Sequence, residues 1–456
     1  MSQQLPPALL ASLQNVKGFS ENAFVHAHEK SEQVTSIRFN PAKFNSQKCT
    51  VNVQSKIPWS THGYYLAERP SFTLDPLFHA GAYYVQDASS MFLEEAIRQT
   101  IDVTAALQVL DLCAAPGGKS TLIQSVISAE SLLVSNEVIK ARVNILVENI
   151  TKWGAPNVVV TNNDPADFQK LPCFFDLIVV DAPCSGSGLF RKDPDAINEW
   201  SLNNVLLCSQ RQQRILADVM PSLKPGGILI YATCSYSERE DEGISDWLVE
   251  AFKLESQQLK VQENQGIVET VSKEKAYGYR FYPDKVKGEG FFIGVFKNTN
   301  GVNAKNEIKL KNKQQSLSKQ ELELLRPYLK NADRFSFLKW KDEVLALPYQ
   351  IYEAVLLLQS VLYLKKAGVK MGIIIRNEVI PDHELAMSTI FSEKINVVPV
   401  DLFTALQYLR RKEVNIVSDY KGWVLLKYNG LPLGRIKILP NRINNYYPPE
   451  WRILNK

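Results

Sequence analysis

The sequence predicts an α/β protein whose main part is a mostly parallel β-sheet with helices on both faces. Between residues 104 and 297, short apolar runs typical of buried strands alternate with segments of helical periodicity, which is the pattern of consecutive βαβ units. Hydrophobic residues make up 45% of the chain and charged residues 22%, the composition of a globular protein. For a chain of 456 residues, this composition suggests roughly three folding units.

The first region, residues 1–103, is expected to be an α+β segment, with a helix at Pro7–Val16 and a strand at Val34–Phe39. The second region, residues 104–297, carries the alternating pattern. Its expected parallel strands are Val109–Leu112, Leu132–Ser135, Val158–Thr161, Leu177–Val180 and Ile228–Ala232. A late pair of strands is expected to add antiparallel pairing, at Arg280–Pro283 and Phe291–Phe296.

Residues 298–318 are polar and rich in Asn and Lys, and we interpret them as a linker. Residues 319–400 are predicted to form an α/β domain, and their clearest helix is expected at Tyr352–Lys366.

The last region, residues 401–456, is predicted to form a β-rich module. A helix near Leu402–Arg411 is expected to precede two strands, Trp423–Tyr428 and Gly434–Leu439. The Asn429-Gly430 dipeptide between these strands is typical of a hairpin turn.

Composition also excludes several classes of protein. Six cysteines in a chain of this length are too few for a disulfide-built scaffold, so a reduced intracellular protein is expected. The N-terminus has no basic leader before an apolar core, and the longest apolar stretch, Ala354–Leu364, is too short to span a membrane. We therefore expect a cytoplasmic protein. The net charge of +4 is too small to indicate a polyanionic partner, so a nucleic-acid surface must come from local clusters of charge.

Ligands of an open α/β sheet bind at the carboxyl ends of the strands, and the first strand runs into a turn of small residues followed by a helix. The turn lacks the glycine that a phosphate loop needs at the position of Cys113, and the G-x-G-x-x-G pattern is absent. It still lets a ligand approach backbone amides at a helix N-terminus. The candidate cofactor-binding residues of this turn are Cys113, Ala114, Ala115, Pro116, Gly117, Gly118 and Lys119.

Acidic residues follow the next two strands. Glu137 stands after the second strand, where a carboxylate can accept both hydroxyl hydrogens of a ribose. Asp164 stands after the third strand and is a candidate contact for an adenine amino group. Because no second phosphate-binding element is present, a nucleoside without phosphates fits better than NAD or ATP, and S-adenosylmethionine is such a molecule. Each acid alone is equally well explained as a loop cap, but acids after successive strands favour a cofactor site.

Two cysteines also end neighbouring strands at this edge. Cys184 follows the fourth strand, which ends near Asp181, and Cys234 follows the fifth. A buried cysteine is usually a small apolar residue, and we interpret three others in this way: Cys49, Cys173 and Cys208. The chain has no C-x-x-C motif and only five histidines, so no metal site is expected.

The motifs DLCAAPGGK, DAPCSGSG, KPGGILIYATCSYSEREDE and GEGFFIGVFK resemble those of the RNA cytosine-C5 methyltransferases of the Nop/Sun group, and the resemblance covers residues 30–297. The tail segments GIIIRNEVIPDHELAM and LPLGRIKILPNRINNYYPPEW look like the C-terminal region of the bacterial RsmF-like branch, whose members modify small-subunit ribosomal RNA. The resemblance implies a Rossmann-like S-adenosylmethionine-dependent methyltransferase core, an N-terminal RNA-contacting α+β segment and a final PUA-like RNA-binding module.

The resemblance also implies roles for single residues. Cys234 is expected to add to carbon 6 of cytosine as the nucleophile, and Cys184 to help remove the carbon-5 proton and release the product. DNA cytosine methyltransferases use a Pro-Cys cysteine as nucleophile, so the reverse assignment stays open. Asp181 is expected to contact cytosine N3 and the cofactor, and Lys119 to face the cofactor's carboxylate or the catalytic pocket. A free thiol is only a few per cent thiolate at neutral pH, so some stabilisation of the anion is expected.

These features predict an enzyme that methylates carbon 5 of a cytosine in RNA, with 16S ribosomal RNA or the small ribosomal subunit as its partner. It is expected to act as a monomer, without a membrane or a metal, on a base that is flipped out or already unpaired. Two alternatives stay open: a transfer RNA methyltransferase with the same core, and a non-catalytic RNA-binding factor of ribosome assembly. The candidate RNA contacts are Arg191, Lys192, Arg211, Arg214, the five lysines of residues 305–319, and a mixed basic and aromatic set in the tail with Trp423, Arg435, Lys437, Arg442, Tyr446, Tyr447, Trp451 and Arg452.

Overall fold

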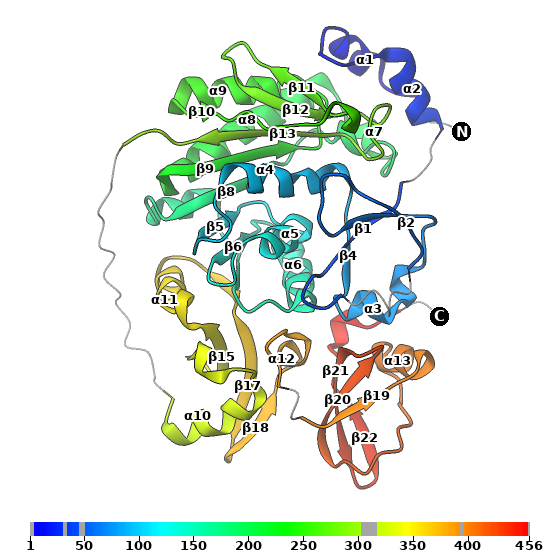
Figure 1. Cartoon of the computed structure of the whole chain (residues 1–456), viewed down its shortest axis with the longest axis vertical. Helices are drawn as coiled ribbons and strands as arrows, with labels where there is room; N and C mark the ends of the chain where they lie inside the picture. Colours follow the sequence, from blue (N-terminus) through cyan, green and yellow to red (C-terminus); the bar gives the residue numbers. More distant parts are fainter. Residues whose placement is uncertain (1–3, 31–33, 45–50, 302–316, 393–394, 455–456) are drawn as a thin grey trace.

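The structure is a computed structural model that describes residues 4–30, 34–44, 51–301, 317–392 and 395–454. The described residues form four sheets, of which the largest lies at the centre of the chain (Figure 1). Most of the predicted linker, residues 302–316, lies outside the described residues. Within the described ranges, no helix has the length and apolar character needed to cross a membrane.

The N-terminal region contributes a small antiparallel sheet and four helices. The sheet has the order β2 (Val53–Lys56), β3 (Gly63–Leu66), β1 (Ser36–Phe39) and β4 (Tyr83–Val85). The helices are α1 (Pro7–Leu13), α2 (Glu21–Glu29), α3 (Pro76–His79) and α4 (Leu93–Thr100). Arg38 on β1 donates to Thr121 Oγ1 at 2.6 Å and so fixes this sheet against the central part of the molecule.

The central sheet confirms the predicted α/β class. Its parallel strands have the order β9 (Leu223–Thr233), β8 (Phe175–Asp181), β5 (Gln108–Asp111), β6 (Leu132–Asn136) and β7 (Val158–Thr161). Beyond β9 follow the antiparallel strands β13 (Phe291–Lys297), β12 (Tyr277–Phe281) and β11 (Val268–Val271), and β10 (Glu255–Ser256) pairs with β13. Most predicted strands are present with small shifts of their ends, but β9 begins well before the predicted residue Ile228. Strand β12 ends at Phe281 and shares only Arg280 and Phe281 with the strand predicted at Arg280–Pro283.

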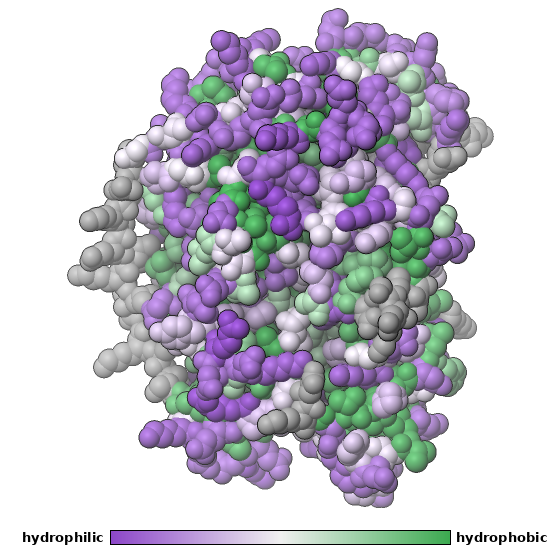
Figure 2. All heavy atoms as spheres, viewed as in Figure 1, coloured by the Kyte–Doolittle hydropathy of each residue, from purple (hydrophilic) through white to green (hydrophobic). Residues whose placement is uncertain are grey.

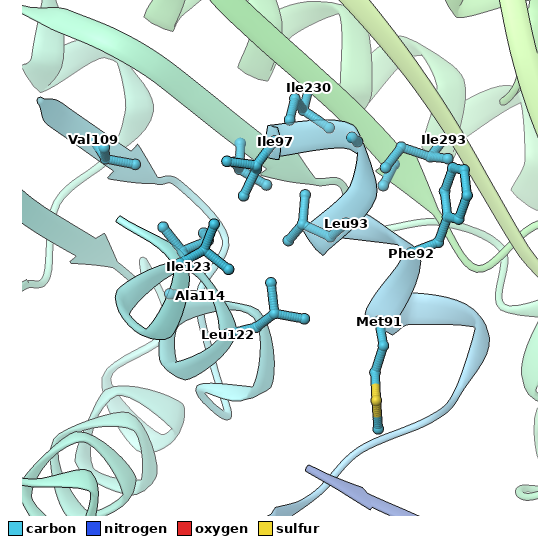
Figure 3. Packing of buried hydrophobic residues seen from close by; sticks show 14 of the residues in the cluster. Met91, Phe92, Leu93, Ile97, Val109, Ala114, Leu122, Ile123, Ile230 and Ile293 are labelled. Atoms are coloured by element: carbon cyan, nitrogen blue, oxygen red, sulfur yellow. The ribbon is translucent and has the colours of Figure 1, made fainter. Parts of the chain in front are cut away.

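Helices cover both faces of this sheet, because its parallel strands are apolar on both sides. The helices of this region are α5 (Gly118–Val126), α6 (Lys140–Trp153), α7 (Ala196–Glu199), α8 (Leu202–Val219) and α9 (Glu242–Phe252). Figure 3 shows one face, where Leu93 and Ile97 of α4 and Ile123 of α5 pack with Val109 and Ile230 of the sheet. The opposite face is covered by α8 and α9.

The segment after residue 351 departs from the sequence prediction. A helix was expected over Tyr352–Lys366, but α11 spans only Tyr352–Val361, and Leu364–Ala367 form strand β16. Strand β16 pairs antiparallel with β7, so a segment beyond the predicted linker supplies the edge strand of the central sheet. The helix prediction was wrong here because pairing with a distant strand, which local periodicity does not report, decides the conformation.

The C-terminal half carries two more sheets. The third sheet has the order β14 (Phe335–Trp340), β15 (Glu343–Pro348), β17 (Val369–Ile375) and β18 (Glu378–Pro381), accompanied by α10 (Lys319–Leu325) and α12 (His383–Met387). The fourth has the order β19 (Val397–Pro399), β20 (Gly422–Tyr428), β21 (Leu431–Leu439) and β22 (Arg442–Asn445), accompanied by α13 (Leu402–Leu409). Asn429 and Gly430 both have positive φ angles, as the predicted hairpin requires.

The fourth sheet begins before residue 401, because β19 pairs with β20. The domain boundaries given in the sequence analysis stay predictions. Figure 2 shows apolar side chains gathered over the lower part of the molecule, where this sheet and α13 lie. Two of the exposed large apolar side chains, Leu402 and Phe403, belong to α13.

Candidate active site at the carboxyl edge of the central sheet

Cys184 and Cys234 come together at one edge of the central sheet. Strands β8 and β9 are parallel neighbours, with Asp181 opposite Ala232, so the loops that follow them leave the sheet side by side. The two Sγ atoms lie 2.8 Å apart, and both cysteines are free and half-buried. Two thiols in this position can contact the same small ring.

The surroundings keep Cys184 protonated. Its hydrogen bond with Cys234 is the largest cause that raises the pKa of the Cys184 thiol well above its usual value, followed by burial and by the charges of Cys234 and Glu240. A thiol with a raised pKa is a poor nucleophile at neutral pH, but its anion is a strong base. In the free protein, Cys184 is therefore the thiol that keeps its proton and donates the hydrogen bond that the two sulfurs share.

Lys119 and Asp181 form an ion pair beside the cysteines. Lys119 Nζ lies 2.7 Å from Asp181 Oδ2, and their side chains are 14% and 33% exposed. Burial alone would lower the pKa of Lys119, but the Asp181 carboxylate outweighs burial and raises it, and Cys234 acts in the same direction. Lys119 is therefore positively charged, and both Asp181 and Cys234 favour its charge. It also lies 5.3 Å from the centre of the Phe291 ring.

The turn after β5 is held by the next strand and helix. Ala114 N–H donates to Asn136 O at 2.8 Å, and Arg142 Nη2 donates to Ala115 O at 2.6 Å. Gly117 has a φ of +116°, a conformation that favours glycine, and α5 begins at the next residue. The candidate residues Cys113 to Lys119 therefore run from the strand end to the N-terminus of a helix, as expected for a ligand-binding turn.

Glu137 and Asp164 follow neighbouring strands, since Asn136 of β6 lies opposite Thr161 of β7. Glu137 is only 3% exposed and accepts from Ile139 N–H at 2.8 Å. Asp164 accepts from Ala166 N–H at 3.1 Å and so caps the helical turn that follows. Both acids thus make the loop contacts that the sequence left open as an alternative. A carboxylate has more acceptor positions than these contacts use, so both can also bind a ligand.

Asp111, the last residue of β5, is a site residue that the sequence reasoning missed. Ser120 Oγ donates to Asp111 Oδ2 at 2.6 Å, whereas the buried Oδ1 has no hydrogen-bond partner among the described residues. Burial raises the pKa of Asp111 to about 7. An unpartnered carboxylate oxygen fits a cationic ligand group, and S-adenosylmethionine carries a sulfonium and an ammonium. A signal was available, because Asp111 ends a strand as the other candidate acids do.

The loop after Cys234 holds further buried charges that the sequence did not reveal. Arg280 on β12 lies 3.1 Å from Asp241 Oδ2, donates to Tyr236 O at 2.9 Å and also pairs with Glu242. Glu240 is fully buried. In the sequence, the run from Glu238 to Glu242 looks like a solvated charged loop, and only the fold turns three of its acids inward.

Some expected RNA contacts are engaged elsewhere. The Arg191 side chain is 7% exposed and donates to Gly288 O at 3.1 Å, so the expected phosphate contact is wrong for this residue. Arg214 lies 3.7 Å from Asp164, and Lys192 lies 3.3 Å from Asp87; both remain accessible. The lysine run of residues 305–319 and Cys49 fall largely or wholly outside the described residues. Within the described part of the chain, no group of three His, Cys, Asp or Glu side chains could hold a metal ion.

The tail brings part of its basic and aromatic set together on the fourth sheet. The ring of Trp423 lies 4.6 Å from that of Tyr446. The Arg435 guanidinium and the Lys437 ammonium lie 5.1 Å and 5.2 Å from the Trp423 ring centre. Trp423 is half-buried rather than part of the core, whereas Tyr447 is buried. A partly exposed aromatic ring beside cations suits stacking on an unpaired base.

Comparison with known proteins identifies the three parts of this arrangement. Residues 99–297 match the family model of the 16S rRNA methyltransferase RsmB/F. Residues 5–88 match that of the N-terminal domain of the 16S rRNA methyltransferase RsmF, and residues 395–453 that of the methyltransferase RsmF PUA domain.

Similar proteins cover most of the chain. The ribosomal RNA small subunit methyltransferase F of Vibrio parahaemolyticus is 29% identical in an alignment of 481 positions that covers 98% of this chain and 97% of that protein. The protein of the same name from Shewanella loihica is 28% identical over 438 residues, which cover 91% and 88%.

Among solved structures, a methyltransferase homolog protein from Pyrococcus horikoshii is 28% identical with a TM-score of 0.52, and the match covers 64% of this chain and 100% of that one. NSun6 from the same organism has the same fold, with a TM-score of 0.54 at 19% identity over 65% of this chain and 98% of its own. The central sheet, the turn after β5 and the flanking regions thus all have their counterparts in one group of enzymes: the chain is similar, part by part, to the S-adenosylmethionine-dependent 16S rRNA methyltransferases of the RsmB/F family and to the N-terminal and PUA domains of RsmF.

Proposed function

We propose that this protein transfers the methyl group of S-adenosylmethionine to carbon 5 of a cytosine in 16S ribosomal RNA, through a covalent cysteine adduct at carbon 6. One observation carries the proposal. Two free thiols, with their sulfurs 2.8 Å apart, end neighbouring strands beside a buried lysine–aspartate pair.

The chemistry needs two sulfurs at one ring. Carbon 5 of cytosine is a poor nucleophile, and it gains electron density when the Cys234 thiolate adds to carbon 6. Carbon 5 then takes the methyl group, and the electron pair of the broken carbon–sulfur bond stays on the sulfur of the cofactor. Once Cys234 is bonded to carbon 6, its hydrogen bond and its charge no longer raise the pKa of Cys184, so the Cys184 thiol can release its proton to solvent. The Cys184 thiolate then takes the carbon-5 proton, which restores the carbon 5–carbon 6 double bond and expels the Cys234 thiolate. Before addition, the raised pKa of Cys184 keeps it protonated and supports Cys234 as the nucleophile.

Lys119 and Asp181 serve the addition step. Lys119 stabilises the attacking thiolate, because its ammonium interacts with Cys234. Asp181 contacts cytosine N3 once N3 has taken up a proton, because an ionised carboxylate can only accept a hydrogen bond. The positive charge of its partner Lys119 offsets the negative charge that builds up on the ring during addition.

The cofactor supplies a methyl group on a positively charged sulfur when it is bound. The residues that would hold it are the turn from Cys113 to Lys119, together with Glu137, Asp164 and Asp111. The unpartnered Oδ1 of Asp111 supports this assignment, because a cation next to it would compensate a buried acceptor.

The substrate assignment rests on the relatives, which carry the name small subunit methyltransferase F over nearly their whole length. We assign RNA contact to residues 1–103 and 401–456, and catalysis to residues 104–297. The cluster around Trp423 and Tyr446 supports RNA contact by the last of these regions.

The test combines transfer and trapping. The protein is incubated with 16S ribosomal RNA and methyl-labelled S-adenosylmethionine, and the product is mapped for 5-methylcytidine. Cys184→Ala is expected to accumulate an RNA–protein adduct that survives denaturing gels, whereas Cys234→Ala is expected to form none. The opposite pattern would exchange the two roles. Label in transfer RNA alone would favour the transfer RNA alternative, and RNA binding without any transfer would favour the non-catalytic one.

A further inference from the structure

We propose that Glu240 is a positioning residue that holds Cys184 and Cys234 opposite each other by bridging the two serines that follow them. The inference rests on the proposed function, in which both sulfurs must reach one pyrimidine ring. Neither the family models nor the sequence motifs assign a role to this carboxylate.

The Glu240 side chain is fully buried and receives four hydrogen bonds. Its Oε1 accepts from Ser185 N–H at 2.8 Å and from Gln212 Nε2 at 3.1 Å. Its Oε2 accepts from Ser185 Oγ at 2.5 Å and from Ser235 Oγ at 2.7 Å. Ser185 directly follows Cys184, and Ser235 directly follows Cys234, so one carboxylate joins the two cysteine loops.

Two further contacts make the bridge rigid. Gln212 Nε2 on α8 also donates to Pro183 O at 3.1 Å, so the residues on both sides of Cys184 belong to the same network. Tyr231 Oη donates to Glu240 O at 2.6 Å and fixes the backbone of Glu240 to β9. Neither cysteine loop can move relative to the other without breaking hydrogen bonds to a buried carboxylate, which is costly.

A carboxylate is costly at this buried position, but the two loops require one. The four donors are neutral groups, and burial raises the pKa of Glu240 against the opposing effect of their hydrogen bonds. Burial of a charge is costly unless hydrogen bonds satisfy it, and here four of them do. A glutamine would avoid the charge, but its amide group would present a donor where a serine hydroxyl or a backbone N–H needs an acceptor. Two acceptor oxygens in one plane are what the two loops require.

The first test measures the geometry without RNA. Reduced protein is treated with diamide, which accepts two electrons and two protons from the thiols and leaves a Cys184–Cys234 disulfide that peptide mass spectrometry detects. Its rate of formation is divided by the rate at which iodoacetamide alkylates each cysteine, so that changed thiol reactivity is not mistaken for changed distance. Glu240→Gln is expected to slow this corrected rate about 10-fold or more. The matched control Glu238→Gln changes an exposed residue of the same loop and should behave as the wild type.

The second test separates positioning from binding. Glu240→Gln is expected to lower kcat for RNA methylation about 10- to 100-fold, with KM for RNA and for S-adenosylmethionine within about twofold of the wild type. Should this variant not fold, Ser235→Ala removes one arm of the bridge and is expected to give both effects in weaker form. The inference would be overturned if a folded Glu240→Gln or Ser235→Ala protein formed the Cys184–Cys234 disulfide at the corrected rate of the wild type. Because the thiol assay needs no substrate, its result stands even if the RNA is methylated at another atom.

Discussion

Asp111 shows how a single buried group ties the cofactor to the stability of the protein. One of its carboxylate oxygens accepts from Ser120, and the other has no partner in the described part of the chain. Burial raises its pKa to about 7, far above the usual value for aspartate. The folded protein without cofactor therefore binds a proton at a pH where the unfolded chain has released it, and a bound cation favours the ionised form instead.

This linkage gives a prediction with a definite sign. The contribution of Asp111 to the free energy of unfolding is fully present below the unfolded pKa, near pH 4, and is lost as the pH rises through about 7. Between pH 5 and pH 8, cofactor-free wild type should lose about 2–3 kcal/mol more than Asp111→Asn. Urea unfolding at both pH values measures the difference, and Asp419→Asn, which changes an exposed aspartate, is the control. Equal losses in wild type and Asp111→Asn would show that Asp111 does not hold this proton.

At the scale of elements, Gly188 and Gly290 let three loops pass in backbone contact beside the cysteines. Gly188 N–H donates to Cys234 O at 2.8 Å, and Gly290 N–H donates to Gly188 O at 3.1 Å. A Cβ on Gly188 would lie 2.6 Å from Gly290 O and 2.7 Å from Cys234 O, and both neighbours are backbone atoms. The loop that carries Cys234 therefore takes its position from the absence of a side chain at Gly188.

Gly188→Ala is expected to displace the Cys234 loop and to slow methylation about 10-fold or more, and overpacking should lower the free energy of unfolding by about 1–3 kcal/mol. Single-turnover methylation and thermal unfolding check the two effects. Gly301→Ala serves as the control, because a Cβ there meets no atom within 4 Å. If Gly188→Ala methylated RNA at the wild-type rate, the position of the Cys234 loop would not depend on the missing side chain at Gly188.

The segment that precedes strand β16 also holds a loop at the edge of the sheet where we expect the cofactor to bind. Asn163 Nδ2 donates to Tyr363 O at 3.1 Å, and Tyr363 N–H donates to Asn163 Oδ1 at 3.0 Å. This reciprocal pair fixes the loop that carries Asp164 to the segment just before β16.

Loss of this pair in Asn163→Ala is expected to cost about 1–2 kcal/mol of unfolding free energy and to weaken binding of S-adenosylmethionine. Isothermal titration calorimetry and chemical unfolding measure the two quantities, with Asn203→Ala, at an exposed position, as the control. Unchanged cofactor affinity in a destabilised Asn163→Ala would restrict the role of the pair to folding.

The sequence predicted the elements whose signals are local. The parallel strands are uninterrupted apolar runs, and the residues at their ends follow from the rule that ligands bind at that edge. Strand β16 was missed because nothing within Tyr352–Lys366 reports the open edge of β7. Glu240 was missed for a related reason, since a run of charged residues does not reveal which members point inward. Arg191 was predicted as an RNA contact for the same reason, because the sequence does not show that its side chain is mostly buried.

At the scale of the whole molecule, one lysine joins three parts of the chain that are far apart in the sequence. Lys43 is buried, and its Nζ donates to Ala80 O at 3.0 Å, Lys152 O at 2.6 Å and Met387 O at 2.7 Å. These carbonyls lie at the ends of α3, α6 and α12, where the helix dipole favours a cation. Burial lowers the pKa of Lys43 to about 7. The N-terminal region, the catalytic region and the C-terminal half thus meet at the Nζ atom of one lysine.

Lys43→Met keeps most of the side-chain volume but leaves three buried carbonyls without their donor. We expect a loss of about 3 kcal/mol or more in the free energy of unfolding, measured by chemical denaturation. The control is Lys56→Met, at an exposed lysine. A loss below about 1 kcal/mol would show that the three regions are joined by other contacts.

The antiparallel pairing of β16 with β7 has a consequence for how the protein can be divided. A fragment that ends near residue 301 would retain both cysteines and the turn from Cys113 to Lys119. It would, however, leave the backbone amide and carbonyl groups along one edge of β7 unpaired. Unpaired sheet borders of this kind recruit strands from other molecules. Such a truncated enzyme is expected to self-associate, so the last third of the polypeptide also serves as a guard against aggregation.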